Sequence, residues 1–287
     1  MISRSSLLSL FAAMLYLGSI QSHAMPIDLL LESNDDSGAG NELFLANFDG
    51  YQSLIDATIN SSSFSQLNIN SNFSSGGLAF DGSSYQLLLE SDVDGNAGNE
   101  VFLASFDSFQ SLLDGTVASS SFSQLNINPN FSAGGLAFDG SSYQLLLESD
   151  VDSGAGNEIF LAGFDSFQSL LDGTVASSSF SQLNINSNFS AGGLAFDGSS
   201  YQLLLESDMD SGAGNEIFLA SFDDFQDLLD GIIADSSFSQ LNINSNFSAG
   251  GLVAYVPDGP VEVPEPASWA LLMFGLGTLM LRRRRTR

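Results

Sequence analysis

Carboxylates recur along this chain at a spacing that suits a hard metal ion. In the second of four similar segments, Asp92 and Asp94 are followed by Glu100, and equivalent acids return twice more at steps of 58 residues. Calcium takes about six to eight oxygen ligands from carboxylates, carbonyls and water. The sequence therefore predicts calcium as the one cofactor to test, with these candidate ligands: Asp92, Asp94, Glu100, Asp150, Asp152, Glu158, Asp208, Asp210 and Glu216.

The same loops also have a purely structural interpretation. Asp, Asn and Gly favour turns for backbone reasons, and in the first segment Asn34 replaces the leading acid, which leaves Asp36 and Glu42. With Asp at positions 1 and 3 and Glu at 9, the loops resemble the calcium loops of FG-GAP propellers. They depart from that pattern where a third acid is expected, at Gly38, Asn96, Gly154 and Gly212. A calcium loop and a solvated turn both stay open.

The basic residues of the chain are confined to its two ends. Residues 25–281 contain no Lys, Arg, His or Cys, whereas all 34 acidic residues lie between Asp28 and Glu265. Ser-His-Asp and Cys-His catalysis need an imidazole base, zinc needs His or Cys for most ligands, and nucleic acid needs Lys and Arg. These functions and disulfide bonds are excluded, so the fold rests on apolar burial and hydrogen bonds.

Carboxylate chemistry is the one enzymatic possibility left. A pair of acids can cleave a glycosidic bond without histidine, so a glycan-active enzyme is the alternative hypothesis. Such a site needs two carboxyl groups in different environments, and near-identical repeats offer the same environment several times. We therefore expect a protein that binds or scaffolds rather than one that catalyses.

The elements that position these acids belong to a unit of 58 residues. Asn-Glu pairs mark its four copies, and residues 85–142 and 143–200 differ at only five positions. Alternating apolar residues predict strands, Asp139-Gly140 predicts a hairpin turn, and Gly173 predicts the end of a short helix. The expected elements are strands at 134–138, 143–148, 158–164 and 180–186, a helix at 165–173, and a loop at 150–156.

Four antiparallel strands per unit predict one blade of a β-propeller. The unit is cut at the chain ends, because residues 27–33 form its second strand and residues 250–255 its first. Pairing the two would close a four-bladed ring and remove exposed sheet edges. The run from Tyr143 to Phe160 also resembles the hairpin of TolB-type propeller repeats. A pair of β-sandwiches and an elongated repeat array are the alternative folds.

Both ends of the chain carry targeting signals. Arg4, an apolar run from Leu7 to Ile20, and Ser22-His23-Ala24 form a secretory signal peptide, with cleavage expected after Ala24. The last segment reads Val263, Pro264, Glu265, Pro266, then an apolar run, then Arg282 to Arg285. We expect a signal peptide at 1–24, a four-repeat domain at 25–256, a linker at 257–262 and a sorting segment at 263–287.

The C-terminal segment resembles the PEP-CTERM sorting signal, a type of segment also labelled an ice-binding protein C-terminal domain. The resemblance implies recognition by an exosortase at Pro264-Glu265-Pro266, transient insertion of a transmembrane helix in the inner membrane, and delivery to the cell surface or matrix. The thirteen apolar residues make a span of ~20 Å, short for a bilayer, and a plain anchor is the alternative. Ice binding has little support because threonine is rare. Exopolysaccharide or biofilm is the expected setting.

Overall fold

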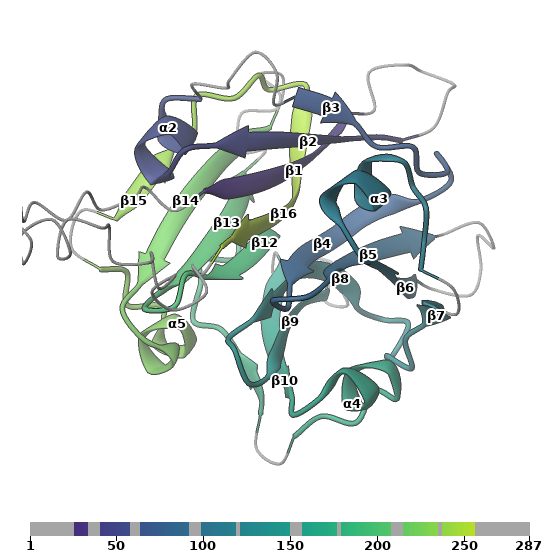
Figure 1. Ribbon diagram of the computed structural model, residues 1–287. Helices are drawn as coiled ribbons and strands as arrows, with labels where there is room; N and C mark the ends of the chain where they lie inside the picture. The colour runs from purple at the N-terminus through teal and green to yellow at the C-terminus, as the bar shows by residue number, and fades with distance from the viewer. Residues whose placement is uncertain are drawn as a thin grey trace, which may run out of the picture.

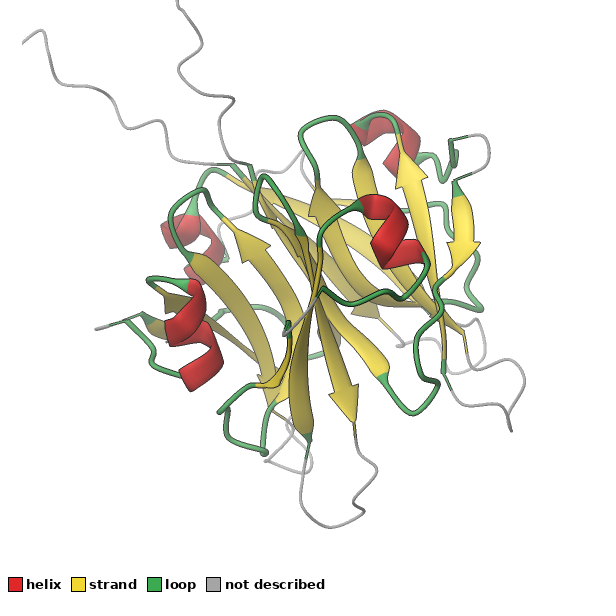
Figure 2. Ribbon diagram, turned by 90° about the horizontal axis from the view of Figure 1, so that it is seen from below, coloured by secondary structure: helices red, strands yellow, loops and turns green. Residues whose placement is uncertain are grey.

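A computed structural model describes residues 26–33, 41–57, 64–91, 99–118, 121–149, 157–176, 179–207, 215–234 and 237–255. They form a four-bladed β-propeller, in which four antiparallel sheets of four strands surround a common axis (Figures 1 and 2). The expected propeller is confirmed.

Three blades follow the sequence without interruption. Blade 1 contains β4 (Ser74–Phe80), β5 (Tyr85–Ser91), β6 (Glu100–Phe106), α3 (Phe109–Leu113) and β7 (Phe122–Gln124). Blade 2 contains β8 (Ser132–Phe138), β9 (Tyr143–Ser149), β10 (Glu158–Phe164), α4 (Phe167–Leu171) and β11 (Phe180–Gln182). Blade 3 contains β12 (Ser190–Phe196), β13 (Tyr201–Ser207), β14 (Glu216–Phe222), α5 (Phe225–Asp230) and β15 (Phe238–Gln240).

The fourth blade joins the two ends of the domain and is called the seam blade below. Its innermost strand is β16 (Phe247–Ala254), followed by β1 (Ile27–Ser33), β2 (Glu42–Phe48), α2 (Tyr51–Ile55) and β3 (Phe64–Gln66). Strand β16 pairs with β1 in antiparallel register, with Ile27 opposite Ala254 and Leu29 opposite Leu252. The expected pairing of the two chain ends is confirmed, so the ring is closed by the chain itself.

The ring is held by apolar burial between blades. Leu87, Leu88 and Leu89 are consecutive in β5, yet each is at most 2% exposed. Successive side chains of a strand point to opposite faces, so a run that is buried throughout needs cover on both faces, and the neighbouring blades provide it. This explains why the second strand of each unit carries consecutive leucines instead of an alternating pattern.

The inner strands approach the axis so closely that only glycine fits there. A Cβ atom on Gly77 would lie 2.7 Å from the backbone nitrogen of Leu136 in the next blade. A Cβ atom on Gly251 would lie 2.7 Å from the nitrogen of Leu78, which completes the circle. Gly135 and Gly193 occupy the equivalent places. The Gly-Gly pair of each unit therefore allows the backbones of neighbouring inner strands to pack closely at the centre.

A carboxylate in each second strand ties its blade to the next. Inner strands bulge just before their second glycine, which frees a backbone N–H from the ladder. That N–H donates to a glutamate of the preceding blade, so a partly buried donor gains a carboxyl acceptor. The four pairs run around the ring: Ser75 to Glu32, Ala133 to Glu90, Ala191 to Glu148 and Ala249 to Glu206.

Several element boundaries differ from the expectation: β8 begins at Ser132, β9 ends at Ser149 and β16 covers Phe247–Ala254, and the outer strand and the helix of the unit are shorter than expected. The outer strand β11 ends at Gln182 instead of residue 186, because the Asn184 nitrogen already donates to the Leu229 carbonyl of the next blade. Helix α4 is shorter than residues 165–173 because Ser166 is its N-cap and the chain turns at Gly173, whose φ is +63°. A left-handed φ suits glycine.

Several expectations concern residues outside the described part of the chain. The signal peptide, the linker, the sorting segment and the loops at 92–98, 150–156 and 208–214 all lie there. Within the described ranges, no helix is both long and apolar enough to cross a bilayer.

Candidate functional site

The candidate calcium ligands divide into two groups. Asp92, Asp94, Asp150, Asp152, Asp208 and Asp210 lie outside the described residues. Glu100, Glu158 and Glu216 are placed, each at the first position of its blade's third strand. The described residues hold no group of three or more acids arranged to bind a metal. Calcium binding stays a prediction.

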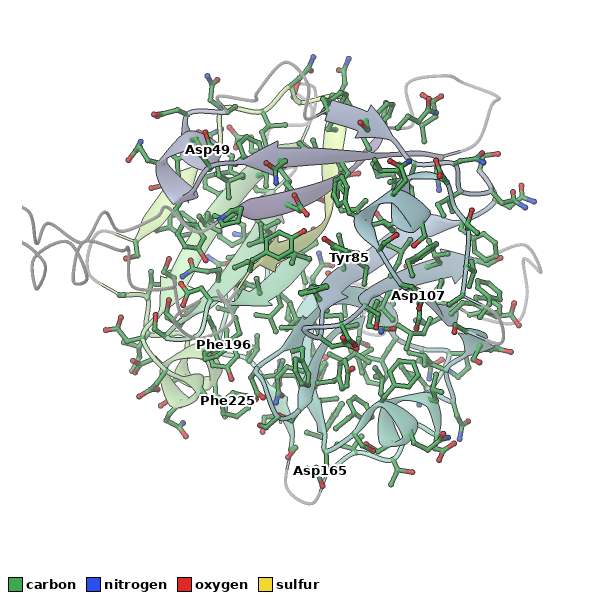
Figure 3. The ribbon with its side chains drawn as sticks, in the orientation of Figure 1. Asp49, Tyr85, Asp107, Asp165, Phe196 and Phe225 are labelled. Carbon is green, nitrogen blue, oxygen red and sulfur yellow. The ribbon has the colours of Figure 1, made fainter. Side chains whose placement is uncertain are left out.

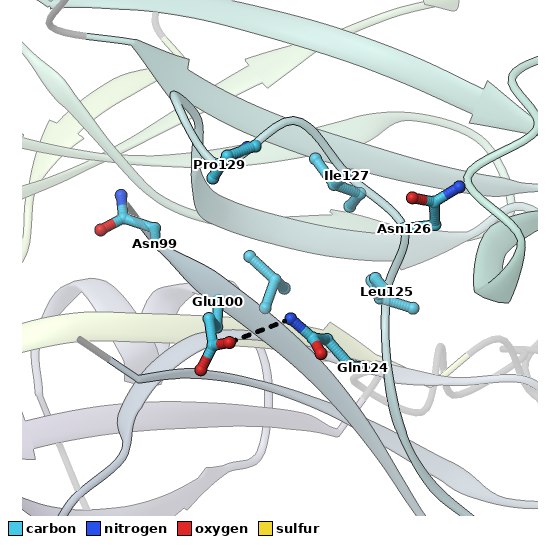
Figure 4. A pocket seen from close by; sticks show the side chains of 8 residues that line it. Asn99, Glu100, Gln124, Leu125, Asn126, Ile127 and Pro129 are labelled. Carbon is cyan, nitrogen blue, oxygen red and sulfur yellow. Dashed lines mark hydrogen bonds between the residues drawn. The ribbon is translucent and has the colours of Figure 1, made fainter. Parts of the chain in front are cut away.

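Each of these glutamates has a defined partner on the outer strand of its blade. Glu100 Oε1 accepts a hydrogen bond from Gln124 Nε2 at 3.3 Å, a pair shown in Figure 4. The same pairing is present in the other blades, as Glu42 with Gln66 at 2.9 Å, Glu158 with Gln182 at 3.3 Å and Glu216 with Gln240 at 3.0 Å. An amide that donates one bond keeps a second N–H and its carbonyl for a ligand.

A stacked aromatic pair lies beside each Glu–Gln pair. The rings of Phe102 and Phe122 are 5.2 Å apart and nearly parallel, and Phe73 contacts both edge-on. Phe122, two residues before Gln124, therefore lies on the same face of its strand. The outer ring of the pair is 41% to 46% exposed in all four blades: Phe64, Phe122, Phe180 and Phe238.

These features define a rim patch in each blade, made of the exposed outer-strand phenylalanine and the adjacent Glu–Gln pair. The patches are Phe64 with Glu42 and Gln66, Phe122 with Glu100 and Gln124, Phe180 with Glu158 and Gln182, and Phe238 with Glu216 and Gln240. Their signal in the sequence is the alternation in Phe-Ser-Gln, which places Phe and Gln on one side of a strand. The sequence analysis predicted the outer strand but not the exposure of its phenylalanine, and so missed the patch.

In blade 1 the rim patch borders a pocket of about 370 Å³. Side chains with amides, from Asn99, Gln124 and Asn126, share its wall with Glu100 and with Pro129 (Figure 4). The Asn99 nitrogen donates to the Pro129 carbonyl at 3.0 Å, which fixes the pocket's two sides relative to each other. The pocket combines amide donors, one carboxylate acceptor and an apolar floor.

A second constellation surrounds the axis at the opposite end of the strands from these glutamates. The turns between the first two strands of blades 1, 2 and 3 begin with Asp81, Asp139 and Asp197. In Figure 3, Tyr85 lies closer to the middle of the ring than Asp49, Asp107 and Asp165, which precede the helices. This end of the axis is the place where a catalytic site on this ring would be sought.

The turn aspartates are occupied by their own turns. Asp81 Oδ1 accepts from the nitrogens of Ser83 and Ser84 at 2.9 and 2.8 Å, and Oδ2 accepts from the Tyr143 hydroxyl of the next blade at 3.1 Å. Burial acts to raise the pKa of Asp81, but the serine hydrogen bonds outweigh it and lower the pKa. The pKa values of Asp139 and Asp197 are lowered by the same balance.

These acids do not form the asymmetric pair that glycosidic cleavage needs. Because all three pKa values are lowered, the three carboxylates stay ionised together. An acid–base pair requires one carboxyl with a raised pKa beside one that stays ionised. Asp28 has a raised pKa because it is buried, but it is 0% exposed and cannot reach a substrate. Asp81 and Asp197 instead accept hydrogen bonds from tyrosines of neighbouring blades, which makes them links between blades.

Comparison with known proteins identifies the C-terminal segment. Residues 262–285 match the PEP-CTERM protein-sorting motif. This confirms the expected resemblance and begins one residue earlier than the sequence boundary at Val263. A PEP-CTERM motif implies export, recognition by an exosortase and sorting toward the cell surface. The search of curated proteins found no match to this chain.

Solved structures similar to this chain include other propeller-like proteins. GH43 endo-arabinanase from Bacillus licheniformis aligns at 13% identity over 73% of this chain and 76% of its own, with a TM-score of 0.40. Arabinanase Arb43A of Bacillus subtilis aligns at 15% identity over 72% of this chain and 75% of its own, with a TM-score of 0.38. TolB from Acinetobacter baumannii aligns at 12% identity over 77% of this chain and 42% of its own, with a TM-score of 0.34. At these scores the likenesses decide nothing about activity. What is established is a chain with a four-bladed propeller followed by a PEP-CTERM sorting motif.

Proposed function

We propose that the mature protein is a non-catalytic binding protein of the cell surface or extracellular matrix, which holds neutral polysaccharide at its four rim patches. The observation that carries this proposal is the repetition of one exposed chemistry in every blade. A stacked phenylalanine that is 41% to 46% exposed and a hydrogen-bonded Glu–Gln pair recur four times around the ring.

The patch has the two kinds of group that a sugar ring requires. An aromatic face offers a flat apolar surface, which suits the C–H face of a pyranose. The amide and carboxylate beside it offer donors and acceptors in the direction of sugar hydroxyls. Ligand sites commonly combine an apolar surface with a few fixed polar groups, and in blade 1 the pocket beside Pro129 adds depth.

Charge limits the polysaccharide to a neutral one. The chain has a formal net charge of −28, and residues 25–281 contain no basic side chain. A polyanion would meet a repulsive field with no cation to pair with. An uncharged polymer has no such penalty, and its repeating sugars can contact several patches at once. Such multivalency raises the overall affinity well above that of a single patch.

The test measures retention of the mature protein in native gels cast with neutral polysaccharides or with uronate-containing ones. We expect slower migration with a neutral polymer only. Phe122→Ala should weaken retention modestly, and the quadruple change at Phe64, Phe122, Phe180 and Phe238 should abolish it. Ser123→Ala, on the other side of the same strand, is the matched control.

Two outcomes would contradict different parts of the proposal. Retention that survives the quadruple change would place the polysaccharide elsewhere on the protein, and no retention with any polymer would refute polysaccharide binding. New reducing ends released from the polymer would favour the alternative of a glycan-active enzyme. Melting curves of each variant would show whether its ring is intact.

A further inference from the structure

Blade 3 departs from the repeat in one stretch of its sequence. It differs from blade 2 at five positions between residues 224 and 235, a stretch that follows β14 and includes α5. Asp224 and Asp227 replace Ser166 and Ser169, and an isoleucine pair replaces a Thr-Val pair. The five residues are Asp224, Asp227, Ile232, Ile233 and Asp235. Changes this concentrated indicate a surface with a task of its own.

The isoleucines are not needed for the packing of the blade. Ile232 is 57% exposed and Ile233 36% exposed, while Leu228 of the preceding helix α5 already fills the core at 0%. Blade 2 folds the same way with Thr174 and Val175 at these positions. Val175 is likewise 37% exposed, so blade 3 differs by having a larger apolar pair at an exposed place, and burying that pair against a partner would be favourable.

Ile233 borders an apolar pocket of about 200 Å³. Its walls come from the link between blades 2 and 3, through Ile185 and Phe189, and from the outer strand, through Phe238. Phe238 is itself 41% exposed. The Asn184 side chain, which also lines the pocket, donates to the Asp230 carbonyl at 3.1 Å and so fixes the end of α5 beside it. This volume suits one aliphatic side chain.

Carboxylates are concentrated on and just before α5, the helix that leads into the two isoleucines. The α5 segment carries Asp223, Asp224, Asp227 and Asp230, whereas the matching segment of blade 2 carries only Asp165 and Asp172. The pKa of Asp227 is raised by desolvation and by the neighbouring charges of Asp224, Asp223 and Asp230. The domain has no Lys or Arg to relieve this repulsion. A cationic partner that binds here would relieve it.

We infer that the pocket beside Ile233, the exposed Ile232 and the α5 carboxylates form a docking surface for a peptide segment of another protein that combines an aliphatic side chain with flanking Lys or Arg residues. The aliphatic group enters the pocket, and the basic groups neutralise the four aspartates. Complementary charge gives such an interface its specificity and association rate. An anionic membrane is disfavoured by the net charge of −28, and a neutral polysaccharide would make no use of the acids.

The test uses the near identity of the blades. In the first variant blade 3 is given the residues of blade 2 by Asp224→Ser, Asp227→Ser, Ile232→Thr and Ile233→Val. In the second, blade 2 is given those of blade 3 by Ser166→Asp, Ser169→Asp, Thr174→Ile and Val175→Ile. Both sets are compatible with the fold because each already exists in the other blade, where Ser166 and Asp224 both cap their helices.

The probe is a synthetic twelve-residue peptide of alternating Leu and Arg, titrated into the mature protein by calorimetry at physiological salt. We expect one peptide per protein, binding weakened about tenfold or more in the first variant, and two peptides per protein in the second. A Gly–Arg peptide of equal charge should bind much more weakly, because it has nothing to place in the pocket.

Three results would overturn the inference. Equal binding of the Gly–Arg peptide would show general attraction to an acidic protein. Unchanged binding by a variant with only Ile232→Thr and Ile233→Val would exclude the pocket. An unaltered stoichiometry in the second variant, with its melting temperature intact, would show that these residues do not make the site.

Discussion

The hydroxyl of Tyr255 donates a hydrogen bond to the carboxylate of Asp28, which joins the end of the described chain to its first strand. The same hydroxyl lies 2.5 Å from that of Tyr85 in blade 1, and Asn47 donates to Asp28 at 2.6 Å. In the other blades, glutamine stands in place of Asp28 and an aspartate in place of Tyr255. The ring is therefore closed by Asp28, Asn47 and Tyr255, whose counterparts in the other blades are residues of other types.

The seam residues compensate one another. Ile27 stands where the other blades have tyrosine, so it has no hydroxyl to offer Asp197 of blade 3. Tyr51, which stands where the other blades have phenylalanine, donates to Asp197 Oδ2 at 3.3 Å instead. In a chain of near-identical repeats, such differences favour the correct pairing of β16 with β1 over pairing with another blade.

We expect Tyr255→Phe to destabilise the whole domain by about 1–3 kcal/mol, the usual cost of leaving a buried acceptor without its donor. A single cooperative urea transition with a lower midpoint would support this, because a closed ring unfolds as a unit. Phe109→Tyr, which adds a hydroxyl at a position where the seam blade has one, serves as a control for tyrosine chemistry outside the seam. An unchanged midpoint for Tyr255→Phe would contradict the role of the seam.

Buried acids predict that stability rises as the solution becomes mildly acidic. Burial raises the pKa of Asp28 and of Glu32, and this outweighs their hydrogen bonds. The folded protein therefore keeps these two protons at a higher pH than the unfolded chain does, and proton binding stabilises the fold. This contribution is complete below the ordinary carboxyl pKa and is lost as the pH rises through the raised pKa values of Asp28 and Glu32.

The measurement is the melting temperature as a function of pH. Asp28→Asn should flatten the rise in stability that accompanies a fall in pH toward the ordinary carboxyl range, because asparagine does not titrate. Below about pH 4 stability should fall again, since the lowered pKa values of Asp81, Asp139 and Asp197 make their contribution depend on ionisation. A variant with the same pH profile as the wild type would show that Asp28 titrates normally.

One blade lacks a hydrogen bond that two others have. Gln86 and Gln202 accept a bond from Ser105 and Ser221, but Gly163 stands at that place in blade 2. Gln144 Oε1 is accordingly the single buried side-chain oxygen or nitrogen in the described residues that has no partner.

We expect Gly163→Ser to stabilise the protein by about 1 kcal/mol through that missing bond. The new Cβ atom would lie 2.9 Å from that of Ser179, so a small shift reduces the gain. Urea unfolding beside the reverse change, Ser105→Gly, measures both directions. A destabilised Gly163→Ser protein would mean that crowding against Ser179 exceeds the value of the hydrogen bond.

The axis glycines should be the positions least tolerant of a side chain. Gly77 has a φ of +148° and would place a Cβ atom 2.7 Å from a backbone nitrogen of blade 2, so Gly77→Ala should cost about 3 kcal/mol or more. Gly82 has a φ of +91° but open space around it, so Gly82→Ala should cost only about 1–2 kcal/mol of backbone strain. Equal losses would contradict the close-packed axis.

The sequence was sufficient to predict the propeller and its closure because a 58-residue repeat, cut inside a unit, leaves few ways to pair its ends. It could not place the inter-blade bonds. The bond from Tyr143 to Asp81 joins residues 62 positions apart, and their proximity depends on the ring geometry, which local spacing does not encode.

The rim patch was missed for a different reason. Phe122 has the apolar character of a core residue, and its exposure follows from its place on a three-residue outer strand.

The last prediction concerns calcium at the loops that precede Glu100, Glu158 and Glu216. Their acids would lie at one end of the ring, since equivalent hairpins share a face, and no basic residue of the domain offsets their charge. An ion that binds only the folded state raises its stability by mass action.

We expect a higher melting temperature in millimolar calcium than in EDTA at fixed ionic strength. Magnesium should have a smaller effect because it demands a tighter octahedral shell. Changing Asp150, Asp152 and Glu158 and their equivalents to amides should remove the difference. An equal shift with magnesium or sodium would indicate general screening, and no shift at all would identify these loops as turns.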